Sequence, residues 1–435
     1  MQADKPTIRS LTGLRFVAAF FVLVAHLAPK AMPFPNPPMW YTQFTSLAAE
    51  GMTMFFVLSG FVMYYNYSES IGRDGLKAAY NFWVARFARI YPMYAIILAY
   101  QFIVDYAYAA LSSAYSQALP YYLLLIQTWF YVPLGRYGLI YDVGMLPPIT
   151  WSVSTECFFY LVFPLLCLVV LRMASVRSRV TLAAVCAVII CTAVTFLSLH
   201  QTALNQWAME HLGKVGDPST QSQYSFFRWL VYFSPYSRVF EFILGCITAS
   251  LYLNIARKPV SDGERRTGHA ILTATLVSCA LLHFVMFSNP NAAGLLRVIT
   301  DFHMSFGFGP MMAVLIFFFA RYESFIKRFL ECWPMVLAGE ATYSMYLWHM
   351  FVAMAVRWEA APVTSFMIGV ADLLRLAVAI TMCVGFGLIS WQFIEVPTRR
   401  WLRSKLSIKM QPAPALALAS KAASAEDRPL AINKR

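Results

Sequence analysis

Arg15 and His26 are ionisable residues within one apolar stretch near the start of the sequence. A helix turns by about 100° per residue, so their spacing of eleven places both side chains on nearly the same helix face, about 16 Å apart along the axis. Imidazole titrates near neutral pH and can remove a proton from a hydroxyl group. A lone histidine near the end of an apolar helix more often makes a structural hydrogen bond, and the residues alone leave both interpretations of His26 open.

A second cationic pair, Arg86 and Arg89, is spaced by three residues, so that both guanidinium groups share one helix face. Guanidinium groups bind phosphate with two parallel hydrogen bonds, which suits a phosphate-bearing ligand. Arginines at the inner start of a membrane span also fix its orientation and bind lipid headgroups. The pair is therefore compatible with a substrate site or with a purely topological role.

Further polar residues lie within or beside other apolar stretches, and such residues are functional hypotheses because a charge in a bilayer is costly. Glu50 and Glu156 are acids near the outer ends of two such stretches. Arg238 and Glu241 are at positions i and i+3 and could form an ion pair. His349 follows two tyrosines in another apolar run; interfacial aromatic residues explain the tyrosines better than they explain the histidine.

Composition indicates which elements must position these residues. The chain of 435 residues is 59% hydrophobic and 13% charged, whereas soluble domains carry about 25% charged residues. A membrane span needs about 20 apolar residues, and this criterion predicts an all-α, polytopic integral membrane helical bundle of about ten transmembrane helices. The predicted spans are Leu11–Ala28, Phe44–Tyr65, Ala88–Ala110, Thr150–Leu171, Val180–Leu199, Tyr236–Ile255, His269–Phe287, Ser305–Ala320, Val336–Val356 and Ile368–Phe393. An eleventh run, Leu119–Val132, is too short and is expected to be re-entrant or interfacial.

The charges set the predicted topology. The net charge is +13, and most of the 34 Lys and Arg residues lie in segments that ten spans place on the inner side, as the positive-inside rule requires. We therefore expect both termini to be cytoplasmic, a membrane domain over residues 1–400 and a disordered cytoplasmic tail over residues 401–435. The basic residues report topology rather than nucleic-acid binding. The eight cysteines form no CxxC pair, so neither a metal nor a redox cofactor is predicted.

Seven segments, in order along the chain, resemble motifs of the acyltransferase-3 family of integral-membrane O-acyltransferases. They are Arg15 with His26, Phe55–Phe61, Arg86–Pro92, Trp151–Glu156, Arg238–Phe242, Tyr343–His349 and Ile394–Pro397. No single motif is specific. The resemblance rests on their order, and it spans about residues 8–400.

This resemblance implies transfer of an acyl group, usually acetyl, from cytoplasmic acyl-CoA to a hydroxyl of an extracytoplasmic or lipid-linked glycan. It further implies a location in a bacterial cytoplasmic membrane, with surface carbohydrate and membrane lipids as partners. His26 would be the catalytic residue, with Arg15 in the same element and Glu156 as a supporting acid of the active site. Arg86 and Arg89 would hold the phosphates of acetyl-CoA. Whether the acyl group rests on His26 or passes directly, and the oligomeric state, stay open.

The chain departs from the family pattern at Thr53, two residues after Gly51, where many members carry an acid. If that acid orients the histidine, its role here falls to Glu50 or to no residue. Many members also carry an additional soluble domain after the spans, whereas this sequence continues only into a short tail. We therefore expect it to act alone on an acceptor presented at the membrane.

The main alternative is a proton-coupled transporter of a small solute or sugar, which also buries ionisable residues in its spans. No inverted repeat is visible in the hydropathy pattern. A polysaccharide polymerase would need a larger outer loop than His200–Pro235.

Overall fold

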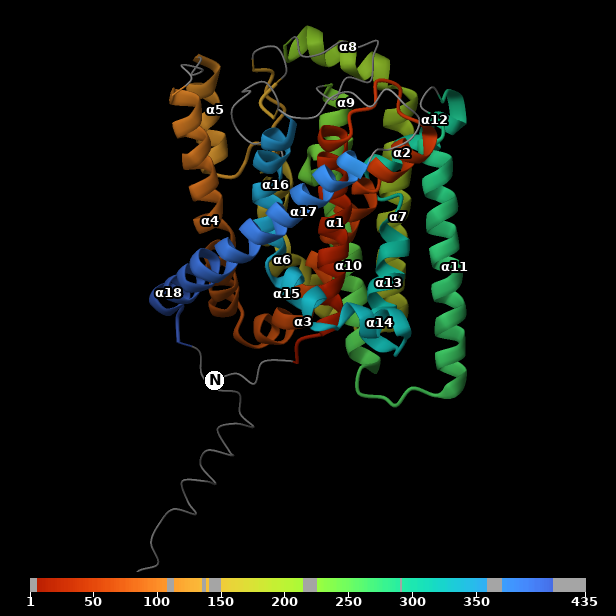
Figure 1. The fold of residues 1–435 in the computed structure, drawn as a ribbon. Coiled ribbons are helices and arrows are strands. Elements are labelled where there is room, and N and C mark those ends of the chain that lie inside the picture. The colour runs from red at the N-terminus through yellow and green to blue at the C-terminus, as the bar shows by residue number, and fades with distance from the viewer. Residues whose placement is uncertain are drawn as a thin grey trace, which may run out of the picture.

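The structure, a computed structural model, describes residues 6–107, 113–134, 138–140, 150–213, 225–289, 292–357 and 370–409, and within these ranges it contains helices and no strand (Figure 1). The helices are α1 (Arg9–Ala31), α2 (Met39–Thr45), α3 (Ala48–Asp74), α4 (Leu76–Ala107), α5 (Ser113–Leu123), α6 (Trp151–Arg172), α7 (Val176–Leu199), α8 (Gln201–His211), α9 (Phe226–Arg228), α10 (Pro235–Ile255), α11 (Asp262–Phe287), α12 (Gly294–Asp301), α13 (Gly309–Arg321), α14 (Phe325–Leu330), α15 (Trp333–Glu340), α16 (Thr342–Arg357), α17 (Val370–Ser390) and α18 (Val396–Leu406). Three short 3-10 or π-helical turns, η2 (Trp229–Phe233), η3 (Phe302–Met304) and η4 (Trp391–Glu395), join neighbouring helices.

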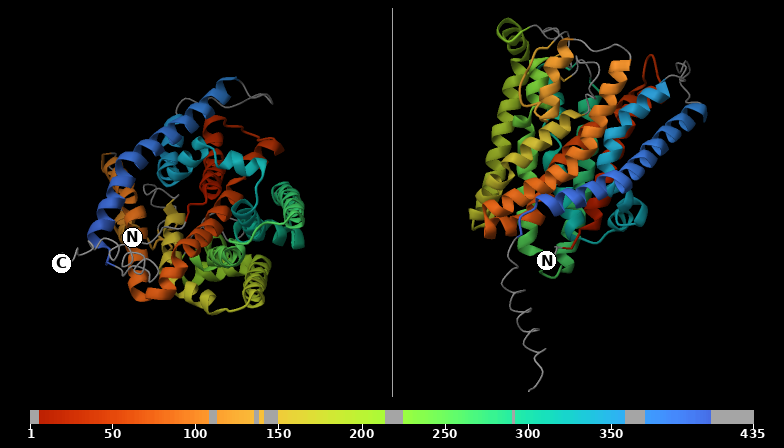
Figure 2. Two further views of the ribbon diagram at one scale, coloured as in Figure 1. Left: turned by 90° about the horizontal axis from the view of Figure 1, so that it is seen from below. Right: turned by 90° about the vertical axis from the view of Figure 1, so that its left-hand side faces the viewer.

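Eight helical segments in the described residues are long and apolar enough to cross a membrane, and a helix pair bent by 43°, Gly294–Met304 with Gly309–Arg321, makes a ninth. The polytopic helical class predicted from the sequence is confirmed. The ninth predicted span, Val336–Val356, corresponds to α15 and α16, which are separated at Ala341. The long helix of α17, η4 and α18 runs obliquely along the outside of the bundle (Figure 2).

Two helix boundaries differ from the prediction. The third span was predicted to begin at Ala88, but α4 begins at Leu76, so Arg86 and Arg89 lie well inside the helix rather than at its start. The added turns are held by packing, since Phe82 is fully buried and the Trp83 indole donates a hydrogen bond of 2.9 Å to a carbonyl of α6. At the other end of the chain, α18 extends to Leu406, into the segment predicted as a tail. Residues 410–435 of that tail lie outside the described residues.

The short apolar run Leu119–Val132 does not form one helix. Helix α5 ends at Leu123, and Leu125 has a positive φ of 57°, which breaks the helical path. Among the described residues, none of the helical segments that are long and apolar enough to span a membrane includes this run. This geometry agrees with the prediction that the run does not span the membrane.

Helices α3 and α10 approach each other closely through two glycines. A Cβ atom on Gly60 would lie 2.0 Å from the carbonyl oxygen of Phe242, and one on Gly245 would lie 2.0 Å from the carbonyl oxygen of Val57. Small residues allow such backbone contact between membrane helices. The glycines thus place α3 at the centre of the bundle, where its remaining side chains reach two other helices.

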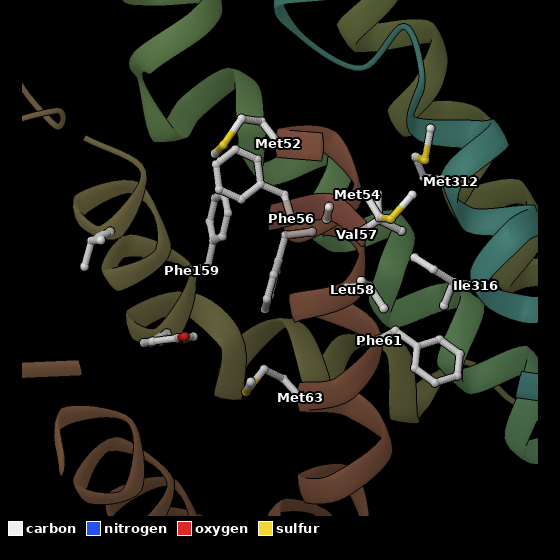
Figure 3. Packing of buried hydrophobic residues seen from close by; sticks show 14 of the residues in the cluster. Met52, Met54, Phe56, Val57, Leu58, Phe61, Met63, Phe159, Met312 and Ile316 are labelled. Atoms are coloured by element: carbon white, nitrogen blue, oxygen red, sulfur yellow. The ribbon is translucent and has the colours of Figure 1, made fainter. Parts of the chain in front are cut away.

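Figure 3 shows how α3 divides the core. Met52 and Phe56 extend toward Phe159 of α6, whereas Met54 extends toward Met312 of α13. All five side chains are at least 96% buried. Because residues on one face of α3 pack against α6, the polar groups on that face, including Ser59, are also held near α6.

We expect Gly245→Ala to destabilise the protein, because its new methyl group would displace the α3 backbone. Overpacking a core costs about 1–3 kcal/mol, which should lower the midpoint of thermal unfolding of the purified protein in detergent. Gly385→Ala in α17 is the matched control, since no atom lies within 4 Å of its added Cβ. Equal unfolding midpoints for the two variants would contradict this description of the α3–α10 contact.

The predicted pairing of Arg238 with Glu241 is confirmed. Their side chains are fully buried and their N–O distance is 3.0 Å. Glu241 also accepts hydrogen bonds of 3.0 Å from the Thr53 hydroxyl and 2.9 Å from the backbone amide of Phe306. The pair therefore ties α10 to α3 and to the segment before α13. The Arg238 guanidinium lies over the Phe56 ring, 5.6 Å from its centre, and forms a cation–π contact with it.

Candidate active site

Four of the five residues predicted for the site line one cavity, which encloses about 110 Å³ among α1, α3, α4, α6 and α16. The four are Arg15, Arg86, Arg89 and Glu156. The remaining walls come from α3, α4, α6 and α16 and combine apolar side chains with hydroxyl groups. They are Met52, Phe55, Phe56, Leu58, Ser59, Met63, Ile90, Ser152, Val153, Tyr160, Thr342, Tyr343 and Tyr346. The cavity thus draws on five of the seven sequence motifs.

The cavity carries an excess of positive charge. Arg86 donates a hydrogen bond of 2.9 Å to the Tyr67 hydroxyl, and its guanidinium lies 5.3 Å from the centre of the same ring. Its Nε atom is buried and has no hydrogen-bond partner among the described residues. Within the described ranges, no acid forms an ion pair within 4.0 Å with Arg15, Arg86 or Arg89. A group of cations that lacks direct acidic partners inside a membrane bundle favours an anionic ligand.

Longer-range interactions with acidic side chains partly stabilise the positive charges of Arg15 and Arg89. Arg89 interacts with Glu395, Glu340 and Glu156, and Arg15 with the last two of these acids. Such longer contacts offset part of the cost of three neighbouring cations without saturating their hydrogen-bond donors. The donors therefore stay available to a phosphate group.

Glu156 projects from α6 into the same cavity. Its Oε1 atom accepts a hydrogen bond of 2.9 Å from the Ser59 hydroxyl of α3, and the Tyr160 hydroxyl is a second hydrogen-bonding neighbour. Ser152, one helical turn away, is bonded instead to Tyr346 of α16, with 2.7 Å between the two hydroxyl oxygens. Ser152 and Glu156 of this motif therefore both line the cavity, and each links α6 to a different helix.

His26 lies outside the cavity lining, farther along α1. Its Nδ1 atom is 2.9 Å from the carbonyl oxygen of Val22. A carbonyl oxygen only accepts hydrogen bonds, so Nδ1 carries the hydrogen and the neutral ring has a bare lone pair on Nε2. This is the form of histidine that can take a proton from a hydroxyl group.

A second histidine, His349 of α16, connects His26 with the cavity. The two imidazole ring centres are 5.0 Å apart, and the ring of His349 lies 5.3 Å from that of Tyr346, which lines the cavity. From the sequence, His349 was noted only as a polar residue that is unusual within an apolar run. Its position beside His26 depends on the packing of α1 against α16, which spacing along the chain does not encode.

Among the residues that the structure describes, no carboxylate forms an ion pair within 4.0 Å with His26, and the partners of Glu50 and Thr53 lie elsewhere. Glu50 binds Nδ1 of His283 on α11, and Thr53 binds Glu241. Of the two possibilities that the sequence left open, these contacts exclude the first: Glu50 has a different histidine as its partner.

The two last motifs close the inner part of the site. The Tyr343 hydroxyl donates a hydrogen bond of 2.8 Å to the carbonyl oxygen of Ile90, next to Arg89. The Ser344 hydroxyl donates one of 3.0 Å to Glu395, the acid that interacts with Arg89. These bonds hold α16 and η4 against the arginine-bearing part of α4.

Comparison with known proteins supports the motif pattern. A family described as an acyltransferase domain, acyltransferase-3, matches residues 8–394. The chain is 29% identical to acyltransferase MdmB of Streptomyces mycarofaciens, over 61% of this chain and 62% of that protein. It is 26% identical to the putative peptidoglycan O-acetyltransferase YrhL of Bacillus subtilis, over 80% of this chain and 50% of that protein. It is 21% identical to the O-acetyltransferase OatA of Staphylococcus aureus, over 90% of this chain and 57% of that protein.

The chain thus spans about half to three-fifths of the length of these relatives. No solved structure matches it. The family match covers nearly the whole membrane bundle, including every residue that lines the cavity. The chain therefore belongs to the acyltransferase-3 family of integral-membrane proteins.

Proposed function

We propose that this protein is a membrane O-acyltransferase. It moves an acyl group, in the simplest case acetyl, from cytoplasmic acyl-CoA to a hydroxyl group of an extracytoplasmic or lipid-linked glycan. The observation that carries the proposal is the single cavity lined by Arg15, Arg86, Arg89 and Glu156. His26 lies farther along α1, outside that lining.

The donor end of the reaction suits the arginine-rich part of the cavity. Coenzyme A bears several phosphates, and Arg86 and Arg89 present guanidinium forks from one face of α4. The Arg86 guanidinium is held between aromatic rings and one hydroxyl, which fixes its orientation before a ligand binds. With the phosphates held there, the flexible arm of coenzyme A would carry the thioester along α1 toward His26, about 16 Å away from Arg15.

The acceptor end suits His26. Its Nδ1–H is fixed by the Val22 carbonyl, so Nε2 is free to accept the proton of an acceptor hydroxyl. The hydroxyl oxygen then attacks the acyl carbon, and the sulfur of coenzyme A leaves. Glu156 acts as the supporting acid of the site, because its carboxylate balances the charge of Arg15 and Arg89 while Ser59 holds its position.

The acceptor class rests on the relatives and on the predicted topology. YrhL and OatA are named for O-acetyl transfer, the former putatively to peptidoglycan. His26 lies toward the end of α1 that the charge distribution places outside the cytoplasm. A glycan presented at the outer face of a bacterial cytoplasmic membrane, either on a lipid carrier or as a nascent surface polymer, would reach it there.

Purified protein in lipid nanodiscs tests this function. With radiolabelled acetyl-CoA and glycans extracted from the source membranes, we expect release of free coenzyme A together with label bound to glycan through an alkali-labile ester. The same protein in liposomes should not accumulate unmodified sugars. Solute uptake without coenzyme A release or glycan labelling would instead establish the transporter alternative.

A further inference from the structure

His349 has a buried nitrogen whose lack of a partner calls for an explanation. The residue is fully buried, and its Nδ1 atom lies 2.5 Å from the carbonyl oxygen of Tyr346. Nδ1 therefore carries the ring hydrogen, and Nε2 is a hydrogen-bond acceptor. This Nε2 atom has no hydrogen-bond partner within the part of the chain that the structure describes. Buried polar atoms are nearly always bonded, because an unmade bond costs free energy.

His26 lies beside the ring that carries this bare nitrogen. The ring centres are 5.0 Å apart and the ring planes are inclined by 52°. The two histidines have the same local arrangement, since each donates its Nδ1–H to a carbonyl of its own helix. With both rings neutral, each Nε2 is an acceptor and the two atoms have no proton to share. One added proton would change that, because a protonated His26 becomes a donor at Nε2.

We propose that His349 is the proton partner of His26 during acyl transfer, an inference that rests on the function proposed above. The acceptor O–H bond breaks and its proton moves to Nε2 of His26 while the oxygen bonds to the acyl carbon. The C–S bond breaks, and sulfur leaves as the thiolate with the bonding electron pair. Nε2 of His349 accepts a hydrogen bond from the new N–H of His26 and shares its positive charge. The proton finally joins the thiolate to give the thiol of coenzyme A.

This role covers one of the two functions that an acid has in other histidine-based sites, because the Val22 carbonyl already orients the His26 ring at Nδ1. In a Ser-His-Asp triad, the carboxylate orients the imidazole and stabilises the imidazolium that forms. Glu50 is bonded to His283 and does not serve His26. His349 instead supplies a neutral hydrogen-bond acceptor that shares the positive charge formed at Nε2 of His26, and it acts through His26 as a positioning residue.

The position of His349 also connects the acceptor side with the donor cavity. Tyr346 lies one helical turn before His349, and its hydroxyl is bonded to that of Ser152 at the cavity wall. His349 thus stands between the base that receives the proton and the cavity that binds the phosphates of the donor. A proton shared between the two histidines stays close to the sulfur that must take it up.

Deletion and chemical rescue of the imidazole test the proposal. In the nanodisc assay, we expect His349→Gly to lower kcat by about 100-fold, the lower range for loss of proton-transfer assistance, with the KM for acetyl-CoA unchanged. Free imidazole should restore transfer, and a series of substituted imidazoles should restore it in the order of their basicity. His349→Gln, which offers an amide acceptor that cannot take up a proton, should recover only part of the activity.

His303→Gly is the matched control, because His303 also has its Nδ1 atom against a carbonyl of its own helical segment, that of Thr300. Its transfer rate should not respond to imidazole. A His349→Gln protein as active as the wild type would overturn the proposal. The proposal would also be overturned if the restored transfer rate did not follow the basicity of the added imidazoles, or if no imidazole restored an inactive His349→Gly protein. A wild-type protein that transfers no acyl group would refute the proposed function itself, and the assay separates these results.

Discussion

Cells that carry His26→Gln in place of the wild-type protein are expected to lose the O-acyl groups of the target glycan. Glutamine retains an N–H that can donate to the Val22 carbonyl, but it cannot accept the hydroxyl proton at a titrating nitrogen. Loss of general base catalysis lowers rates by about 10²–10⁴-fold. The measurement is mass and NMR analysis of surface glycans from a deletion strain that expresses each variant.

His200→Gln is a close control for this substitution. His200 follows α7, and its Nδ1 atom lies 2.9 Å from the carbonyl oxygen of Phe196, the same spacing and distance as in His26 with Val22. Unlike His26, it is exposed and has no histidine neighbour among the described ring contacts. We expect the His200→Gln strain to retain O-acylation. Full O-acylation in the His26→Gln strain, with the protein present in the membrane, would refute the catalytic role of His26.

The second large effect concerns the donor. We expect the double variant Arg86→Lys with Arg89→Lys to insert normally and to show a KM for acetyl-CoA raised by about 10- to 100-fold. The estimate assumes the loss of about 1.5–3 kcal/mol for charged hydrogen bonds. Lysine keeps the positive charge that sets topology, but it cannot form the planar two-bond contact with phosphate or retain the guanidinium stacking on Tyr67.

Arg179→Lys provides the control for the arginine pair. Arg179 is a partly buried arginine near the start of α7, where it bonds to the carbonyl oxygen of Met173 and does not line the cavity. Its replacement should leave the KM for acetyl-CoA unchanged. If the double lysine variant also has a wild-type KM, the arginine pair serves topology alone and the donor binds elsewhere.

Hydropathy predicted most of the bundle because a membrane span has a minimum length of apolar residues. It could not predict where helices break or how far they extend into polar segments. The separation of α15 from α16 at Ala341 interrupts a continuous apolar run, and α4 begins before its apolar run because packing against α6 stabilises the added turns. Both features arise from tertiary contacts rather than from local composition.

The candidate site was predictable to the extent that its residues lie in recognisable motifs. Arg15, Arg86, Arg89 and Glu156 were each singled out, and they meet in one cavity. The partner of His26 was not predictable, because two residues more than 300 positions apart meet only through the packing of α1 on α16. Ser152 shows the same limit: its neighbour along α6 is Glu156, but its hydroxyl is bonded to another helix.

The central claim is that one protein joins a cytoplasmic donor to an acceptor on the other side of the membrane. Sealed proteoliposomes of known orientation test it most directly, with the glycan acceptor enclosed and radiolabelled acetyl-CoA outside. We predict labelled glycan in the lumen when the cytoplasmic face of the protein is outward and His26 is intact, and none with the opposite orientation or with His26→Gln. Label that appears regardless of orientation, or in the absence of His26, would contradict the account.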